Sequence, residues 1–336
     1  MIKFSLIGCG KIGRRHAEQM QPFGQLVAVC DIDKDKADAL AMQYGAMAYG
    51  SLDQLLAGHE GSTVAAICTP NGLHAVQSIA CLRTGLHVIC EKPMALTTSD
   101  CEAMIAAATA SERKLFCVKQ NRFNPPVTAV KKAIDEGRLG RIYSIQLSCF
   151  WNRDEKYYES PWRGTKELDG GTLFTQFSHF IDLLYWMVGD IKQAKAFVQN
   201  FAHKNMIEFE DSGVVIIEFE NGAIGTINYT VNSFARNMEG SLTVLGEKGT
   251  VKIGGQYLNE LSYQSIDHYS IGPLPAGNAP NDYGGYQGSM SNHDKIYENV
   301  FHVLNGKEGI SIGAVDGLKT VKIIQQIYSS VNTVNG

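Results

Sequence analysis

The first 120 residues alternate between short apolar runs and longer segments with one apolar face. Apolar residues dominate 2–7 with little alternation, which is typical of a strand buried on both faces of a parallel sheet. Further runs of this kind occur at 26–30, 63–70, 87–93 and 114–121, and helix-like segments separate them at 11–20, 33–44, 72–85 and 99–112. This alternation predicts an α/β Rossmann domain with a doubly wound parallel sheet over residues 1–121. Thr98 or Ser99 is the predicted N-cap of the last of these helices.

The pattern changes after residue 121, where one helix is followed by a series of β-like runs. The helix is predicted at 123–140, with prolines at its start and a glycine stop. The β-like runs lie at 141–150, 194–201, 213–220, 223–231 and 241–246. Asn221-Gly222 separates two of them and signals a hairpin. No helix-sized segment divides the last three runs, so we expect an open, largely antiparallel sheet.

Residues 122–336 therefore have the pattern of an α+β domain for substrate binding and oligomerisation. Helices are predicted at 172–188, 292–306 and 314–331, and whether the terminal helix packs back on the first domain is left open. Residues 265–290 are rich in Gly, Pro, Ser, Asn and Tyr, which predicts a long loop. A length of 336 residues exceeds one ordinary core, which agrees with two domains.

The run VVIIEF at 214–219 is apolar on both alternating faces. One face is expected to meet the helices of its own domain. The other is expected to meet a second subunit, because an exposed apolar sheet face of that size is uncommon in a monomer. We therefore expect a homodimer or a homotetramer.

Composition excludes several classes of partner. A net charge of −4 provides no basic field for nucleic acid. No apolar run approaches the ~20 residues of a spanning helix, and the N-terminal apolar run is too short for a signal peptide, so neither a membrane nor export is expected. The eight cysteines form no CxxC pair and no His-containing cluster at ligand spacing, so no metal is expected. Buried free thiols in a reducing cytoplasm are the predicted state.

A glycine-rich turn follows the first predicted strand. Gly8, Gly10 and Gly13 form G-x-G-x-x-G between that strand and a helix. In this setting the first glycine permits the tight turn, the second lets a pyrophosphate approach the backbone, and the third lets helix and strand pack closely. Asp31 ends the second strand at the spacing of the acid that binds the adenosine ribose. A carboxylate there repels a 2′-phosphate, so the expected cofactor is NAD rather than NADP, although Lys34 lies close in sequence.

Two more strand ends carry chemistry. Ligands of doubly wound sheets bind at the carboxyl ends of strands, and CTPNGLH at 68–74 and CEKP at 90–93 both follow predicted strands. Pro70 and Asn71 are expected to line the nicotinamide side, and Lys92 is expected to point into the crevice. A solvated loop lysine is the alternative for Lys92.

The segment 151–190 has the third concentration of functional side chains. Its first part mixes Arg with aromatic residues and suits a polar ligand with anionic groups. In the predicted helix 172–188, His179 and Asp182 share a face with Thr175 and Gln176. A buried core histidine is the alternative reading of His179.

These motifs, in this order, resemble the glucose–fructose oxidoreductase, inositol dehydrogenase and rhizopine-catabolism family (Gfo/Idh/MocA). The residues that carry the resemblance are the glycine loop, CTPNGLH, CEKPM and GG…SH, and the resemblance covers the whole chain. In that family a lysine and a histidine flank the carbon that transfers its hydride to the nicotinamide, which implies catalytic roles for Lys92 and His179. Many relatives carry Asp four residues before that histidine, where this chain has Thr175.

Within the family, VKQNRFN, the segment 140–171, TQFSHFIDLLYWMVG and NMEGSLTVLGEKGTVKIGG resemble the UDP-N-acetyl-2-amino-2-deoxyglucuronate 3-dehydrogenases. The resemblance implies NAD-dependent oxidation of the 3-hydroxyl of a nucleotide sugar, UDP-N-acetylglucosaminuronic acid, for diacetamido-uronic acids of lipopolysaccharide and other surface polysaccharides. An inositol- or hexose-type dehydrogenase, a keto-sugar reductase and a non-catalytic NAD-sensing regulator remain alternatives.

The motifs and the resemblance together give the expected site. The cofactor-binding residues are Gly8, Gly10, Lys11, Ile12, Gly13, Asp31, Thr69, Pro70, Asn71, His74, Glu91, Lys92 and Gln120. The substrate-binding residues are Lys92, Arg122, Asn124, Arg153, Tyr157, Tyr158, Trp162, Arg163, Thr175, Gln176 and His179. His179 can accept a proton near neutral pH and Lys92 can donate to a developing alkoxide, but which of them is the formal base is left open.

Overall fold

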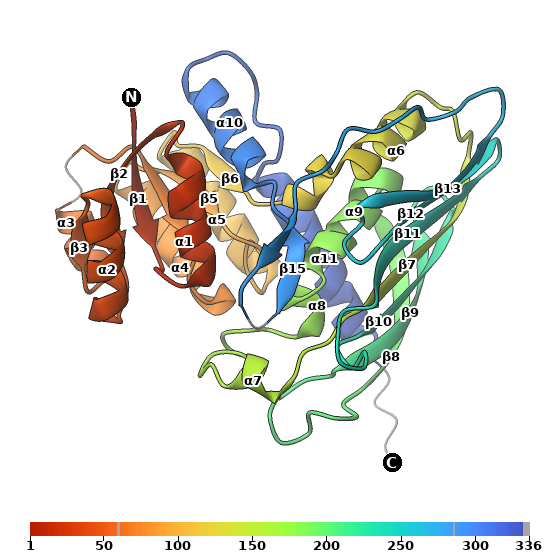
Figure 1. The fold of residues 1–336 in the computed structure, drawn as a ribbon, viewed down its shortest axis with the longest axis horizontal. Coiled ribbons are helices and arrows are strands. Elements are labelled where there is room, and N and C mark those ends of the chain that lie inside the picture. The colour runs from red at the N-terminus through yellow and green to blue at the C-terminus, as the bar shows by residue number, and fades with distance from the viewer. Residues whose placement is uncertain (59–60, 285, 332–336) are drawn as a thin grey trace. The chain divides into compact units, whose positions relative to one another are not determined.

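The structure is a computed structural model that describes residues 1–58, 61–284 and 286–331 (Figure 1). The chain forms two compact units, each defined by contacts among its own residues. The first consists of Met1–Lys119 and His293–Val321, and the second of Gln120–Asn292 and the chain from Lys322 onward. The domain limits 1–121 and 122–336 stay a prediction about which parts fold independently.

A parallel sheet of six strands, counted over the described residues, forms the centre of the first unit. Its strands, in spatial order, are β3 (Met47–Tyr49), β2 (Gly24–Cys30), β1 (Ile2–Ile7), β4 (Val64–Ile67), β5 (His87–Cys90) and β6 (Leu115–Cys117). The register pairs Ile7 with both Cys30 and Ile67, and Ile67 with Cys90. The central strands therefore end in one row, and the loops that follow them emerge from the same edge of the sheet.

Helices connect these strands, as the apolar pattern predicts. They are α1 (Lys11–Met20), α2 (Lys34–Tyr44), α3 (Leu52–Ala57), the 3₁₀ turn η1 (Asn71–Leu73), α4 (His74–Arg83) and α5 (Thr98–Ala110), and α10 (His293–Leu304) and the start of α11 (Ala314–Ser329) join the same unit. The predicted N-cap of α5 was wrong by one or two positions. Thr97 has the extended backbone of a cap, and its hydroxyl accepts the hydrogen bond from the Asp100 amide.

A mixed sheet of seven strands, again counted over the described residues, forms the second unit. Its strands, in spatial order, are β13 (Glu260–Ile266), β12 (Gly249–Gly254), β11 (Glu239–Gly246), β7 (Ile142–Phe150), β10 (Ile224–Thr230), β9 (Ser212–Phe219) and β8 (Ile191–Gln199). The hairpin at Asn221-Gly222 is confirmed, since β9 and β10 pair antiparallel. The sheet is mostly antiparallel as predicted, but β7 lies between β10 and β11 and pairs parallel with β10.

The remaining elements of the second unit are short. They are η2 (Gln120–Phe123), α6 (Pro125–Asp135), α7 (Glu155–Tyr158), α8 (Thr172–Thr175), α9 (Ser178–Val188), β14 (Pro280–Asp282) and β15 (Gln287–Met290). The helix predicted at 172–188 is two helices, because the backbone at Phe177 leaves the helical region. The segment 265–290, predicted as a loop, contains the β14–β15 ribbon, which its loop-like composition does not reveal.

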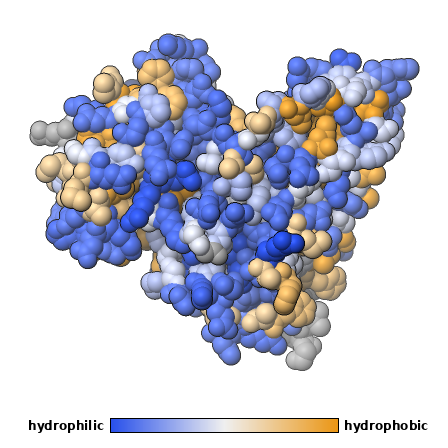
Figure 2. Space-filling model, in the orientation of Figure 1, coloured by the Kyte–Doolittle hydropathy of each residue, from blue (hydrophilic) through white to orange (hydrophobic). Residues whose placement is uncertain are grey.

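The sheet of the second unit has one buried face and one open face. Along β9, Val215, Ile217 and Phe219 are buried, whereas Val214 and Ile216 are 50% and 55% exposed. Helices α6 and α9 lie on the buried side, where they contact β12 and β7 (Figure 1). On the open face Phe197 pairs with Val214 across β8 and β9. Figure 2 shows apolar residues along the sheet side of this unit.

All eight cysteines are free and buried, as predicted. Burial raises the pKa of the Cys9 thiol to about 12 and that of Cys30 to about 11, with the Asp31 carboxylate adding to the effect. These thiols are therefore protonated packing residues. Over the described residues no helix is both long enough and apolar enough to cross a membrane.

Candidate active site

The glycine loop of the first unit is a cradle that side chains would fill. Gly8 has φ +95°, and a Cβ there would lie 2.6 Å from the Cys68 carbonyl oxygen. A Cβ on Gly13 would lie 1.9 Å from the Gly8 carbonyl oxygen, so both glycines are required by the fold itself. Gly10 differs, because a Cβ there would meet no protein atom within 4 Å. Packing does not demand a glycine at that position, which leaves close approach of a ligand as its physical reason.

Asp31 follows β2 and reaches back to this loop. Its Oδ2 accepts from the Cys9 amide at 2.8 Å, and its Oδ1 accepts from the Asp33 amide at 2.9 Å. These bonds hold the carboxylate beside the glycine turn, where the adenosine ribose of a dinucleotide is bound in this fold. Lys34 pairs with the Asp38 carboxylate one helical turn on, and that hydrogen bond raises the pKa of Lys34. Its charge is thus partly balanced already.

The loop after β4 is tied to the segment after β5. The His74 ring has Nδ1 2.7 Å from the Pro93 carbonyl oxygen and Nε2 2.9 Å from that of Thr69. Thr69 also donates its hydroxyl to Gln77 Oε1 at 2.6 Å, and Asn71 is buried in η1. His74 thus joins the two predicted nicotinamide-side segments through their backbones, and its predicted contact with the cofactor stays a prediction.

Glu91 lies in a buried network beneath Lys92. Its Oε1 is 2.8 Å from His16 Nε2 and 3.4 Å from His293 Nε2, and its Oε2 accepts from the Lys92 amide at 2.9 Å. His16 Nδ1 lies 2.7 Å from the Tyr297 hydroxyl. Burial alone would raise the pKa of Glu91, but its contacts with the two histidines outweigh that effect and hold it well below the usual range. His16, Glu91 and His293 are all buried, their possible ligand atoms lie within 4.8 Å of one another, and direct hydrogen bonds join His16 to Glu91 and Tyr297.

The other predicted cofactor residues are placed as follows. Lys11 is exposed and Ile12 half-buried at the start of α1, and Pro70 is half-buried after β4. Gln120 belongs to the second unit, where its buried Oε1 has no hydrogen-bond partner among the described residues. The glycine cradle, the α1 N-terminus and Asp31 fit NAD, which supplies the hydride acceptor when bound.

In the second unit, His179 is the second residue of α9 and is 2% exposed. Thr175 precedes it by four residues and donates its hydroxyl to the Asp169 carbonyl oxygen at 3.1 Å and to the Asp169 carboxylate. Asp169 is buried, and its Oδ2 accepts from the Gly164 amide at 2.8 Å. A carboxylate thus reaches the hydroxyl at the position where many relatives carry an aspartate.

Arg122, Asn124 and Asp182 are engaged within the protein. Arg122 donates from Nε and Nη2 to the two Asp182 oxygens at 2.7 and 2.8 Å, and both side chains are buried. Asn124 donates to the Tyr257 carbonyl oxygen at 3.0 Å and accepts from Asn292 at 2.8 Å. Both side chains are thus engaged within the protein, and their predicted contact with the substrate stays a prediction.

Arg153 is a buried guanidinium with neutral neighbours. Its Nε donates to Gln176 Oε1 at 2.7 Å, and its Nη1 donates to Asn237 Oδ1 at 3.2 Å. The guanidinium also stacks over the rings of Trp151 and Tyr157. Among the described residues no carboxylate lies within ion-pair distance of it. Burial lowers the pKa of Arg153, as expected for a cation that lacks a counter-charge.

Arg163 shares two aromatic neighbours with Arg153. Its guanidinium lies 4.0 Å from the centroid of Tyr157 and 5.5 Å from that of Tyr286, and Arg153 lies 5.2 and 5.1 Å from the same rings. Arg163 donates to the Tyr157 carbonyl oxygen and the Tyr286 hydroxyl, both at 3.0 Å, but its buried Nε has no partner among the described residues. Arg153, Arg163, Tyr157 and Tyr286 are the arginine–tyrosine cluster, in which two guanidinium groups share the same two aromatic neighbours. Guanidinium groups are the side chains that bind carboxylates and phosphates through paired hydrogen bonds.

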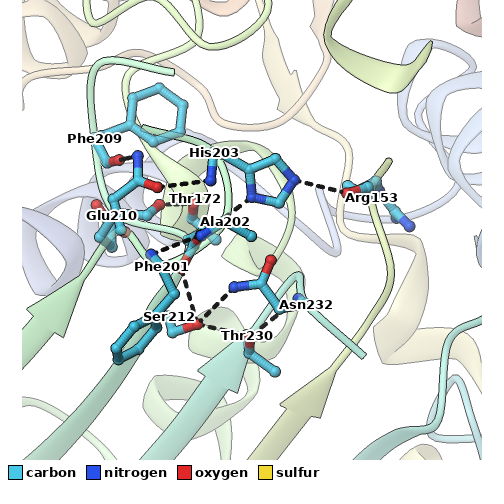
Figure 3. A network of polar contacts seen from close by, with 12 residues as sticks. Arg153, Thr172, Phe201, Ala202, His203, Phe209, Glu210, Ser212, Thr230 and Asn232 are labelled. Carbon is cyan, nitrogen blue, oxygen red and sulfur yellow. Dashed lines mark hydrogen bonds and ion pairs between the residues drawn. The ribbon is translucent and has the colours of Figure 1, made fainter. Parts of the chain in front are cut away.

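A polar network fixes the backbone at Arg153 (Figure 3). The His203 ring has Nε2 3.0 Å from the Arg153 carbonyl oxygen and Nδ1 3.1 Å from Asp211 Oδ2. The same Asp211 oxygen accepts from the amides of Phe201 and Ala202. Burial alone would lower the pKa of His203, but its bonds to Asp211 and the Arg153 carbonyl outweigh this and raise it. His203 therefore favours the imidazolium, which can donate from both nitrogens.

Two other predicted contacts lie beside the cluster. Tyr158 is buried against His203 and Ile207, and Trp162 is half-buried under Arg163. Sequence reasoning missed Asp169, His203, Asp211, Asn237 and Tyr286. Arg153 and Asn237 are 84 residues apart and Arg163 and Tyr286 are 123 apart, so no local pattern could pair them. Only the tyrosine-rich composition of 265–290 gave a signal.

The fold and the glycine–Asp31 cradle define an NAD-binding oxidoreductase. The NAD-binding Rossmann-fold model of the oxidoreductase family matches residues 2–119, and the GFO/IDH/MocA C-terminal domain model matches residues 127–252. The chain belongs to the Gfo/Idh/MocA family and is an NAD-dependent oxidoreductase that acts on a CH–OH group.

Similar proteins differ in what they bind. The WlbA dehydrogenase of Bordetella pertussis, crystallised with NADH and UDP-GlcNAcA, is 35% identical with a TM-score of 0.87, covering 98% of this chain and 96% of that one. Levoglucosan dehydrogenase of Pseudarthrobacter phenanthrenivorans is 29% identical over 58% of this chain and 56% of its own length. Inositol 2-dehydrogenase of Rhizobium meliloti is 27% identical over 81% of this chain and 82% of its own.

Proposed function

We propose that this protein uses NAD to oxidise the 3-hydroxyl of UDP-N-acetylglucosaminuronic acid, in the synthesis of diacetamido-uronic acids for surface polysaccharides such as lipopolysaccharide. The observation that carries the proposal is the arginine–tyrosine cluster, in which Arg153 and Arg163 have no carboxylate partner among the described residues. The similarity to a dehydrogenase crystallised with UDP-GlcNAcA supports the choice of ligand.

The charge of this substrate matches the cluster. A diphosphate and a uronate together carry about three negative charges at neutral pH, and guanidinium groups bind both kinds of anion through paired hydrogen bonds. A neutral sugar or cyclitol would leave two partly buried cations without a counter-charge. The similarity to levoglucosan and inositol dehydrogenases makes a neutral sugar the competing candidate.

In the proposed reaction the substrate hydroxyl loses its proton as its carbon is oxidised. The hydroxyl has a high pKa, so a base must take the proton during the step. His179 stands at the N-terminus of α9, and an imidazole side chain can accept the proton near neutral pH. The Lys92 ammonium stabilises the developing alkoxide. Which of the two is the formal base stays open, and the same residues would serve a keto-sugar reductase.

Other residues position these groups. Gln176, which lies between α8 and α9, donates to the Tyr157 hydroxyl at 2.7 Å while it accepts from Arg153. The cluster is therefore hydrogen-bonded to the chain three residues before His179. Glu91 holds the Lys92 backbone through its hydrogen bond to the Lys92 amide.

We also propose that the open face of the second-unit sheet, with Phe197, Val214 and Ile216, forms the interface of a homodimer or homotetramer.

A substrate panel tests the proposal. NADH formation is measured with UDP-N-acetylglucosaminuronic acid, UDP-N-acetylglucosamine and myo-inositol. The uronate is expected to react fastest, and UDP-N-acetylglucosamine poorly because it lacks the carboxylate. The matched variants are Arg163→Gln, which removes a cluster cation, and Arg138→Gln, which removes an exposed one. Faster reaction with myo-inositol, or equal loss in both variants, would contradict the proposal.

A further inference from the structure

The second unit contains a cavity of about 610 Å³ at the end of strands β11–β13. Its volume falls in the range of small-molecule sites. Gly254 and Gly255 line one part of it, and a Cβ on either would lie within 2.4 Å of Ser262 Oγ or Asn259 Oδ1, so the local packing requires both glycines. Glu239, Asn259, Glu260 and Ser262 supply polar side chains to the lining, and Met238 and Met290 supply apolar ones.

The lining suits a neutral ring with donors and acceptors rather than an anion. Glu239 and Glu260 outnumber the one cation, Lys252, whose Nζ lies 3.3 Å from Glu239 Oε1. A phosphate would therefore be repelled. Carboxylates accept hydrogen bonds from ribose hydroxyls, side-chain amides match the edge of a base, and Met238 and Met290 offer apolar surface to its face.

Hydrogen bonds connect this cavity to the arginine–tyrosine cluster. Tyr257 lines the cavity, and its hydroxyl accepts from Asn237 Nδ2 at 3.0 Å. Asn237 Oδ1 in turn accepts from Arg153 Nη1 at 3.2 Å. On a second path the Gln256 carbonyl oxygen accepts from Trp151 Nε1 at 3.3 Å, and the Trp151 ring packs against the Arg153 guanidinium. One side chain therefore connects the cavity lining to Arg153 on each path, Asn237 on the first and Trp151 on the second.

We propose that this cavity binds the nucleoside of a nucleotide sugar, while the arginine–tyrosine cluster binds its anionic groups. The inference rests on the proposed function and adds a second subsite to it. In this arrangement the segment of Gln176 and His179 binds the sugar. Arg153 and Arg163 bind the negatively charged groups, and the cavity binds the base and the ribose. This order matches the covalent order of a nucleoside diphosphate sugar.

Filling the cavity tests the inference. Ser262→Trp and Met238→Trp each place an indole in it, at two exposed positions. Ser265→Trp is the matched control, because Ser265 is exposed on the same strand β13 but does not line the cavity. Binding of UDP-N-acetylglucosaminuronic acid, of UDP and of N-acetylglucosaminuronic acid 1-phosphate is measured by calorimetry on the full chain with NAD.

Both cavity variants are expected to weaken the binding of UDP and of the nucleotide sugar by about tenfold or more, because the indole clashes with the nucleoside. The sugar 1-phosphate, which lacks the nucleoside, should bind all three variants and the wild type equally. Unchanged UDP binding in both cavity variants would overturn the inference and leave the proposed function standing. If the wild type binds neither UDP ligand, the proposed function fails together with it. Unchanged binding of the sugar 1-phosphate, which is expected to use the same unit, reports whether the second unit of each variant is folded.

Discussion

Arg122 and Asp182 form a buried bidentate ion pair, with N–O distances of 2.7 and 2.8 Å. The pair joins η2 to α9, the helix that carries His179. It decides which arginines of the second unit are available to an anionic ligand, because the charge of Arg122 is already balanced. The expected contact of Arg122 with the substrate stays a prediction, and the structure shows that its guanidinium bonds to Asp182.

Breaking this ion pair should destabilise the protein. Asp182→Asn leaves a buried guanidinium without its counter-charge, so the free energy of unfolding is expected to fall by about 3–5 kcal/mol. Urea denaturation measures the change. Glu136→Gln is the control, since it removes the partner of the exposed Arg138 and should cost under about 1 kcal/mol. An equally small effect of Asp182→Asn would show that the pair is not a structural element.

Replacing either proposed catalytic residue should separate chemistry from cofactor binding. Lys92→Ala and His179→Ala are each expected to lower turnover on the order of a hundredfold or more, with NAD affinity nearly unchanged. Initial rates and NAD titration measure the two effects. Lys114→Ala, an exposed lysine, is the control. If His179→Ala instead unfolds at modest temperature, His179 is a core residue and its proposed role is wrong.

Asp31 should set the preference for NAD over NADP. In NADP a 2′-phosphate replaces the ribose hydroxyl that would bond to the Asp31 carboxylate, and its negative charge is repelled there. NADP is therefore expected to bind more weakly than NAD by roughly 2–4 kcal/mol. Titration of both cofactors measures the gap, and Asp31→Ala should narrow it. Equal affinities in the wild type would contradict the argument and point to Lys34, despite its pairing with Asp38.

Glu210 should make stability fall as pH rises. Its Oε1 accepts from the hydroxyls of Tyr229 at 3.0 Å and Tyr328 at 2.7 Å, and burial raises its pKa from 4.5 to about 7. Below pH 4.5 the carboxyl is protonated in both the folded and the unfolded chain. Above that pH only the unfolded chain ionises, so stability is lost progressively up to about pH 7, by roughly 3 kcal/mol in total.

The test for Glu210 compares unfolding free energies at pH 5 and pH 8. Glu210→Gln keeps the shape of the side chain without its ionisation, so the fall with pH should shrink in that variant. Glu159→Gln, which replaces an exposed carboxylate, should leave the fall unchanged. A pH dependence that survives in Glu210→Gln would assign it to other groups.

Placing a charge on the open sheet face should dissociate the proposed oligomer. Ile216 is 55% exposed there, and Ile216→Glu is expected to convert a dimer or tetramer to smaller species by desolvating a carboxylate in the interface. Light scattering at micromolar concentration measures the mass. Val315→Glu is the matched control, because Val315 is 56% exposed on α11. A wild-type monomer would contradict the assembly.

Local patterns predicted most of the first unit correctly. The order strand, glycine turn, helix, strand and acid at β1, α1 and β2 is confirmed, because each step depends on neighbours in sequence. Local patterns did not predict the features that depend on pairing between distant segments of the chain. Nothing local shows that β7 lies between β10 and β11, or that loop-like residues at 280–290 pair as a ribbon. Strand neighbours that are distant along the chain leave no periodic signal.

The sequence by itself determined the cofactor class, the two kinds of sheet and the side chains available for chemistry. Glycine spacing, strand periodicity and the identity of Asp31 act over short stretches, so they can be interpreted without coordinates. Only the tertiary structure decided how the arginines are used. Arg122 is neutralised by Asp182, which is 60 residues away, whereas Arg153 and Arg163 stack on Tyr157 and Tyr286 and, among the described residues, form no ion pair with a carboxylate. A side chain's charge balance depends on its neighbours in space, and folding chooses those neighbours from the whole chain.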